Sequence, residues 1–237
     1  MPEKVSYEGK DLEALADMPR YYDWIMEHFR PHLHGSAVEF GAGLGTISER
    51  ILASVSTLDL IEPSPNLVER LRHRFAGERR VRIFPETLED RIRLADDHTY
   101  DTAVMVNVLE HIEDDVWALK ELRRLLRPGG KLLVFVPAMP FLYSRLDERV
   151  GHYRRYTRPV LVERLSHAGF TVLLARYMDV LGILPWWLVN TLGGRTEFDP
   201  RAVRLYDTLG IPLTRLAEGL FSPPLGKNIV AVADKPE

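Results

Sequence analysis

A glycine-rich segment at residues 38–46, VEFGAGLGT, is the clearest chemical signal in the chain. Its glycines follow a short apolar run, as they do in a turn that joins a strand to a helix. Such glycines adopt backbone dihedrals that other residues avoid, and they let a ligand approach the main chain closely. The amides of the helix N-terminus behind the turn can also bind an anionic group. The segment predicts a ligand site at Gly41 and Gly43.

An acidic residue at a suitable distance supports this prediction. Glu62 follows the next apolar run, about 20 residues after the glycines, where an acid binds the ribose hydroxyls of nucleotides in βαβ units. A dinucleotide fingerprint would need glycine at the position that Thr46 holds. The pattern therefore favours a ribose-containing ligand other than a dinucleotide. The alternative is a tight turn followed by a solvated acid.

Two histidines could transfer protons, because an imidazole titrates near neutral pH. His111 lies in LEHIEDD, and His152 lies in DERVGHYRRYTRP. The neighbouring Arg154 and Arg155 could hold a phosphate or carboxylate through paired hydrogen bonds. We expect His152 to act as the catalytic base, with both arginines binding the substrate. The alternative is a solvated basic loop.

Strands and helices must position these residues. Short apolar, β-branched runs predict seven strands, at Ala37–Phe40, Thr57–Ile61, Val81–Phe84, Thr102–Val106, Lys131–Val136, Thr171–Arg176 and Asn228–Ala233. Helical patterns alternate with them, which is typical of a doubly wound, mostly parallel α/β sheet. We expect the last strand to be antiparallel.

Local signals mark several helix ends. Ser64 and Pro65 offer an N-cap and a first-turn proline for a helix over 66–75. Apolar residues at 116, 119, 122 and 126 predict a helix that stops at RPGG, 127–130. Thr157 is a candidate N-cap for a helix that ends before Gly169.

Two segments fall outside the alternation, within what we expect to be a single domain over 1–237. Residues 1–35 should form helices that cover one end of the sheet. Residues 178–227 separate the last two strands, and an insertion of this length usually forms a cap. Pro185 should interrupt its first helix. Trp186 and Trp187 should lie on an apolar inner or interfacial face of this cap.

Composition excludes several classes of function. A net charge of −3 over 237 residues gives no general attraction to nucleic acid or anionic lipid. Without cysteine, disulfides, thiolate metal sites and cysteine nucleophiles are excluded. The pair His32 and His34 has no nearby acids, so no metal site is expected. The N-terminus lacks an apolar signal segment, and the run 180–189 is too short for a membrane span, so we expect a cytoplasmic protein.

Taken together, the ordered motifs resemble a known family. VEFGAGLGT, LDLIEPS, ETLED, YDTAVMVNVLEHIEDD and LRPGGKLLVFVPA are similar, in order and spacing, to the motifs of class I S-adenosylmethionine-dependent methyltransferases. The resemblance spans about residues 21–170 and the last strand. The GHYRRY stretch resembles an element of a bacterial subgroup that acts on small molecules. The resemblance implies S-adenosylmethionine as the cofactor and S-adenosylhomocysteine as its product.

The resemblance also implies roles for single residues. Gly41 and Gly43 would pack against the methionyl part of the cofactor, Glu39 would help to hold its ammonium group, and Glu62 would bind both ribose hydroxyls. The remaining contacts would come from Tyr21 closing over the cofactor, Thr87 and Leu88 at the adenine, and the Asn107 carbonyl at the ammonium. The usual aspartate at the adenine site is absent, although Glu86 or Glu89 could replace it. Tyr21 could equally be part of a packed helix face.

We therefore expect methyl transfer to an oxygen or nitrogen of a small acceptor, such as a sugar, an anionic metabolite or a lipid-linked sugar. Two alternatives remain open. A nucleotide-dependent oxidoreductase or epimerase is disfavoured by the incomplete dinucleotide fingerprint, and a degenerate fold serving as a binding module is disfavoured by the intact glycines and Glu62. We expect no nucleic-acid partner, no membrane span but room for contact with a membrane interface, and a monomer or homodimer.

Overall fold

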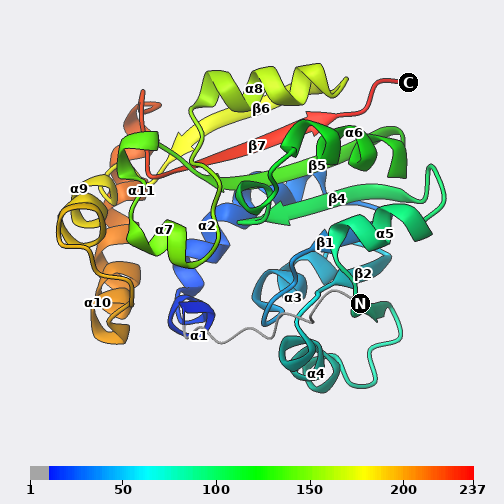
Figure 1. The fold of residues 1–237 in the computed structure, drawn as a ribbon, viewed down its shortest axis with the longest axis horizontal. Coiled ribbons are helices and arrows are strands. Elements are labelled where there is room, and N and C mark those ends of the chain that lie inside the picture. Colours follow the sequence, from blue (N-terminus) through cyan, green and yellow to red (C-terminus); the bar gives the residue numbers. More distant parts are fainter. Residues whose placement is uncertain (1–10) are drawn as a thin grey trace.

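The computed structural model describes residues 11–237 and arranges them around one central sheet (Figure 1). The seven strands have the order β3-β2-β1-β4-β5-β7-β6. They are β1 (Ser36–Phe40), β2 (Thr57–Ile61), β3 (Val81–Phe84), β4 (Tyr100–Val106), β5 (Leu126–Pro137), β6 (Thr171–Met178) and β7 (Asn228–Asp234). β7 runs antiparallel to both β5 and β6, and the other pairs are parallel. The predicted α/β fold with an antiparallel last strand is confirmed.

Helices cover both faces of the sheet (Figure 1), which explains why its strands are apolar on both sides. In β1, Val38 and Phe40 belong to one core cluster and Ala37 to the other, because successive side chains alternate across a strand. The first cluster includes residues of α5 (Leu88–Leu94), α6 (Asp115–Leu125) and α8 (Arg158–His167). The second includes residues of α2 (Pro19–Phe29), α3 (Thr46–Leu52) and α4 (Pro65–Arg74). This arrangement leaves the carboxyl edge of the sheet for a ligand.

The predicted helix ends are close to those observed. The Thr157 hydroxyl accepts a hydrogen bond from the Val160 N–H and caps α8. Ser64 precedes α4 as expected, but its side chain makes no capping bond. α6 ends at Leu125, one residue earlier than predicted, because Leu126 already pairs with Tyr100 at the start of β5.

Residues 178–227, which we call the cap, contain five helical segments. They are α9 (Ile183–Trp186), the π-helical η4 (Trp187–Leu192), α10 (Pro200–Leu205), the π-helical η5 (Tyr206–Gly210) and α11 (Ile211–Leu220). The predicted interruption at Pro185 was wrong. Pro185 lies in the first turn of α9, where backbone N–H groups have no intrahelical acceptor, so the missing N–H costs no bond.

The N-terminal helices pack beside the cap. α1 (Asp11–Ala16) and α2 precede a short 3-10 turn, η1 (Arg30–His32). The Asp207 carboxylate of η5 accepts hydrogen bonds from the backbone N–H groups of Arg20 and Tyr21 in α2. Residues 1–10, part of the predicted N-terminal cover, lie outside the described residues. In residues 11–237, no helix combines the length and apolarity that a membrane crossing needs.

Gly45→Ala should destabilise the protein more than Gly77→Ala. Both glycines have a positive φ, 79° and 83°, so alanine costs about 1–2 kcal/mol at either position. At Gly45, however, a Cβ would lie 2.9 Å from the Phe75 ring and 3.0 Å from Leu71, whereas at Gly77 it would contact nothing within 4 Å. Overpacking should therefore add about 1–3 kcal/mol at Gly45 only. Urea unfolding of the two variants measures the difference, and equal losses would contradict this reasoning.

Candidate active site

A large cavity of about 1180 Å³ opens at the carboxyl ends of the strands. The ends of β1, β2 and β4 contribute Phe40, Ile61 and Val106 to its wall. Residues of α1, α2 and the cap complete the enclosure. Ligands of open α/β sheets bind at this edge, so the cavity is the candidate active site.

The predicted glycine turn forms one end of the cavity. The backbone N–H groups of Gly41 and Ala42 donate to the Ile61 carbonyl, at 2.9 and 3.2 Å, which fixes the turn against β2. Gly41 and Gly43 have φ values of 69° and 55°, a region that favours glycine. A side chain at 41 would collide with Val108 Cγ2 at 2.5 Å. The turn therefore requires glycine, and both residues line the cavity.

Glu62 is a buried cavity residue and not a solvated loop acid. Its Oε2 accepts a hydrogen bond from the Gly43 N–H at 2.9 Å, and its Oε1 accepts one from the Ser64 N–H at 2.9 Å. The two carboxylate oxygens thereby link the glycine turn to the start of α4. Each oxygen keeps further acceptor capacity, since a carboxylate can accept about four hydrogen bonds.

Glu39 lies in β1 at the same end of the cavity. It is almost fully buried, and the Ser48 hydroxyl of α3 donates a hydrogen bond to its Oε2 at 2.5 Å. Burial raises the pKa of Glu39 to about 8, although the bond from Ser48 partly offsets this. A cationic group bound nearby would favour the ionised carboxylate, so Glu39 suits an ammonium ligand.

The other predicted cofactor residues line the same cavity. Thr87 caps α5 by accepting from the Asp90 N–H at 3.1 Å, which leaves its backbone and Leu88 beside the space. Asn107 follows β4 with a φ of 53°, an uncommon conformation for a residue other than glycine. Tyr21 packs edge-on against Phe135. Its hydroxyl donates to the Asn228 side chain at 2.8 Å, so Tyr21 is both a packed residue and a cavity residue.

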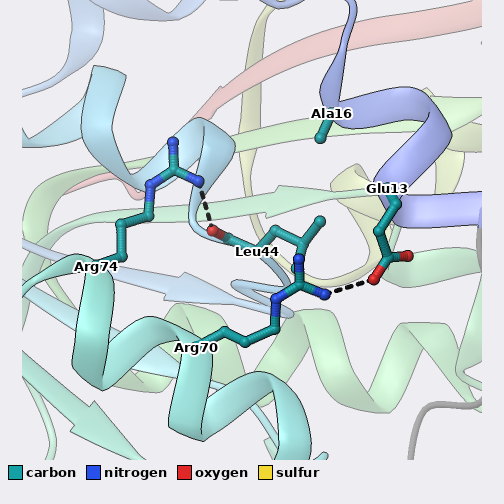
Figure 2. A pocket seen from close by; sticks show the side chains of 5 residues that line it. All are labelled: Glu13, Ala16, Leu44, Arg70 and Arg74. Atoms are coloured by element: carbon teal, nitrogen blue, oxygen red, sulfur yellow. Dashed lines mark hydrogen bonds and ion pairs between the residues drawn. The ribbon is translucent and has the colours of Figure 1, made fainter.

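A smaller hollow beside the glycine turn shows how α1 is held (Figure 2). Arg70 of α4 forms an ion pair with Glu13 of α1, and Arg74 donates to the Leu44 carbonyl of the turn at 2.8 Å. Leu12 and Leu15 of α1 line the large cavity. Exposed ion pairs are weak, so α1 closes the cofactor end through contacts that can open.

His152 also lines the cavity, on the loop after α7 (Arg145–Arg149). Its Nδ1 is 2.8 Å from Asp147 Oδ1. Burial alone would raise the pKa of Asp147, but hydrogen bonds from His152 and Arg155 and the Arg155 charge lower it below the ordinary value. Because the ionised carboxylate only accepts, Nδ1 donates to it, and the other ring nitrogen, Nε2, lies 3.8 Å from Glu110 Oε1. The loop thus presents an oriented base to the cavity.

The two predicted arginines differ in position. Arg155 is buried and lines the cavity, where its Nε and Nη2 donate to the two Asp147 oxygens at 2.9 and 3.1 Å. Arg154 is not among the cavity-lining residues. Its guanidinium contacts Asp115 at 2.9 Å and donates to the Glu113 carbonyl at 2.7 Å. A buried aspartate thus holds Arg154 outside the cavity lining, and its role at the substrate stays a prediction.

Several cavity residues were missed by the sequence reasoning. Lys227, just before β7, forms an ion pair with the buried Asp179 at 2.8 Å and lies 5.7 Å from the centre of the Trp186 ring. Arg155 lies over the same ring at 4.5 Å. A single lysine before a strand belongs to no recognisable sequence motif. Lys227 meets Trp186 only because the cap folds back over β7. Asp147, five residues before His152, could have been noticed as its partner.

One cluster in residues 11–237 has the composition of a metal site. Glu110 and His111, in the 3-10 turn η2 (Leu109–His111), and His152 offer ligand atoms within 4.8 Å of one another. Burial raises the pKa of Glu110 to about 8 and lowers that of His111 to about 4, so both groups are uncharged at neutral pH. His32 and His34, for which no metal site is expected, are not part of this cluster.

The cofactor end fits the ligand that the motifs imply. S-adenosylmethionine carries a ribose, an adenine, a carboxylate and two positive charges. Glu62 offers acceptors for hydroxyls, Glu39 offers a carboxylate for an ammonium group, and the glycine turn leaves its main chain accessible. Leu88 and Ile112 add apolar surface beside them, which suits an adenine ring.

Comparisons with known proteins agree with this geometry. A methyltransferase domain family matches residues 38–132. The ubiquinone biosynthesis O-methyltransferase of Xanthomonas oryzae pv. oryzae (strain PXO99A) is 30% identical over 210 residues, which cover 79% of this chain and 82% of that enzyme. An uncharacterised 37.1 kDa protein from transposon TN4556 of Streptomyces fradiae is 32% identical over 168 residues, covering 68% of this chain. The match covers 46% of that protein, so the chain spans about half of its length.

The fold is also that of solved methyltransferases. The N-methyltransferase NodS of Bradyrhizobium japonicum WM9, solved with S-adenosylhomocysteine, aligns with a TM-score of 0.63 and 15% identity. The alignment covers 97% of this chain and 94% of that protein. The motifs occur in the family's order, the glycine turn contacts Glu62, and the chain is similar to the Xanthomonas enzyme along most of its length. The chain therefore belongs to the class I S-adenosylmethionine-dependent methyltransferases.

Proposed function

We propose that this methyltransferase acts on a hydroxyl oxygen of a small acceptor that carries an anionic group. The observation that carries the proposal is the Asp147–His152 pair in the cavity wall. A neutral amine is already nucleophilic, whereas a hydroxyl becomes a good nucleophile only as it loses its proton. A base held in one tautomer by an ionised aspartate suits the hydroxyl.

The chain's own groups have separate tasks in this reaction. Bound S-adenosylmethionine supplies a methyl group on a positively charged sulfur, which is an activated leaving group. Glu62 and Glu39 hold the cofactor at the glycine turn. His152 Nε2 accepts the proton that the acceptor hydroxyl loses, and Asp147 stabilises the imidazolium that forms. The cap and α1 enclose the cavity and exclude water, so that positioning provides most of the rate enhancement.

The distribution of charge in the cavity supports an anionic acceptor. Carboxylates gather at the cofactor end, namely Glu39, Glu62, Glu86 and Glu89. The acceptor end has more cations than carboxylates, with Arg149, Arg155, Arg195 and Lys227 against Asp147, Glu197 and Asp199. A cationic cofactor and an anionic acceptor would each meet the opposite charge. Arg155 and Lys227, which share the Trp186 ring, are the residues that we expect at the acceptor's phosphate or carboxylate.

The acceptor end is also apolar enough for a substrate with a hydrophobic part. Trp186, Val189 and Phe198 of the cap line it beside the cations. A carboxylated or phosphorylated sugar or metabolite would match the cationic residues of the cavity. A lipid-linked sugar would match both the cationic residues and the apolar residues of the cap. The Xanthomonas relative bears the name of an O-methyltransferase, which supports oxygen as the target atom.

An acceptor screen with methyl-labelled S-adenosylmethionine tests this proposal. The panel should hold hydroxyl compounds in matched pairs, with and without a phosphate or carboxylate, together with amines and tRNA. We expect methylation of the anionic hydroxyl compounds and a clear preference over their neutral partners. Arg155→Lys should reduce that preference, because lysine lacks the bidentate geometry. Labelling of amines or tRNA alone would refute the proposal.

A further inference from the structure

The outer face of the cap exposes many large apolar side chains. They are Leu181, Leu184, Trp187, Leu188, Val189 and Leu192 in the first half, and Leu205, Leu209, Leu213, Leu216, Leu220 and Phe221 in the second. Figure 1 shows α9, α10 and α11 together at one side of the molecule, away from α4 and α5. Soluble monomers rarely expose so many apolar residues in one region. An exposed apolar face of this kind indicates a surface that binds a partner.

The exposed residues form stripes at helical spacing. In the first half, Leu181, Leu184, Leu188 and Leu192 are three or four residues apart, which places them on one side of the helix formed by α9 and η4. In the second half, the leucines at 205, 209, 213, 216 and 220 do the same along α10, η5 and α11. Each stripe is of the kind that amphipathic helices present to a membrane interface.

This face continues into the cavity. Pro185 and Val189 are exposed on the outside of the cap and also line the cavity. Trp186, between them, lines the cavity from within. The exposed leucines of α9 and η4 are therefore close in sequence to apolar residues that line the cavity.

Cations without carboxylate partners border both stripes. Arg195 lies three residues after the end of η4 and also lines the cavity, and Arg201 precedes Leu205 by one helical turn. Both side chains are exposed, and neither forms an ion pair with any residue in 11–237. Of the cap acids, Asp179, Asp207 and Glu218 are buried, whereas Glu197 and Asp199 are exposed.

We propose that the outer face of the cap binds the surface of an anionic phospholipid bilayer. The stripes would lie at the depth of the lipid headgroups, and Arg195 and Arg201 would contact lipid phosphates. A second copy of the chain fits less well, because the same face of a partner would bring the same arginines. The exposed acids of the cap already have contacts within the chain. Glu197 lies 3.8 Å from Arg149, and the Asp199 side chain caps α10 by accepting a hydrogen bond from the Arg201 N–H. Anionic lipid supplies the missing negative charge.

Vesicle flotation of the full chain tests the proposal without knowledge of the acceptor. The wild type should float with vesicles of phosphatidylcholine and phosphatidylglycerol and remain unbound with phosphatidylcholine alone. Leu216→Glu and Leu188→Glu should each lower the partition coefficient by about tenfold, because a charge replaces buried apolar area. Arg195→Gln and Arg201→Gln should each lower it by roughly fivefold.

Leu94→Glu is the matched control. Leu94 at the end of α5 is 67% exposed, as is Leu216, but it lies outside the cap, so this variant should float like the wild type. Binding of S-adenosylhomocysteine by each variant shows whether it is folded and separates this test from that of the proposed function. Equal flotation of the Leu216→Glu and Leu94→Glu variants would overturn the proposal. So would a wild type that does not float but forms a dimer, in sedimentation, that Leu216→Glu abolishes.

Discussion

Glu62→Ala should weaken the binding of S-adenosylhomocysteine by about 10- to 150-fold, which corresponds to a loss of roughly 1.5–3 kcal/mol for hydrogen bonds to a charged group. The carboxylate is buried in the cavity wall, where it can bind both ribose hydroxyls. It also accepts the Gly43 and Ser64 N–H groups, each at 2.9 Å, so its removal frees the glycine turn as well. Titration calorimetry at neutral pH measures the change.

Glu69→Ala provides the control for this measurement. Glu69 is exposed on α4, seven residues further along the chain, and it does not line the cavity. This variant should bind S-adenosylhomocysteine as tightly as the wild type. If Glu62→Ala bound equally well, the placement of the cofactor at the glycine turn would have to be abandoned.

His152→Ala should lower turnover by roughly 10²- to 10⁴-fold on a hydroxyl acceptor found in the screen, with the affinity for S-adenosylhomocysteine unchanged. The imidazole is held by Asp147 at 2.8 Å and lines the cavity, so its loss removes the base without altering the glycine turn. Asp147→Asn should also lower turnover, because an amide can donate to Nδ1 and favour the wrong tautomer. Initial rates at saturating cofactor measure both effects.

His167→Ala is the matched control for the histidine substitution. His167 is exposed in the last turn of α8, outside the cavity, so its replacement should leave turnover unchanged. Full turnover in His152→Ala would show that the acceptor needs no base from this loop. The Asp147–His152 pair would then be structural, and the argument for a hydroxyl acceptor would lose its main support.

Sequence periodicity was sufficient for the sheet and most helix ends. All seven strands were predicted, and six agree within two residues at each end, because each is a short apolar run closed by a turn signal. β5 begins at Leu126, five residues before the predicted start at Lys131. Local chemistry also identified the Thr157 cap and the Ser64-Pro65 helix start. It failed at Pro185, where the outcome depended on the position of the proline within its helix. That position is set by how η4 packs, which no local pattern contains.

The cofactor end and the acceptor end differ in how far the sequence predicted them. Gly41, Gly43 and Glu62 were identifiable because a strand, a tight turn and an acid after the next strand follow one another at fixed spacing along the chain. The sequence by itself therefore determined the fold class and the glycine turn that contacts Glu62. Backbone geometry over short distances in the chain is enough to place these groups.

Only the tertiary structure decided the acceptor end. Arg154 and Arg155 are adjacent in sequence, yet Asp115 draws the first away from the cavity and Asp147 holds the second in its wall. Lys227 and Trp186 meet because the cap packs back over β7, and the same packing leaves the leucine stripes exposed. Each of these outcomes depends on which buried carboxylate or apolar surface lies nearest in space, and residues far apart in the chain supply that neighbour.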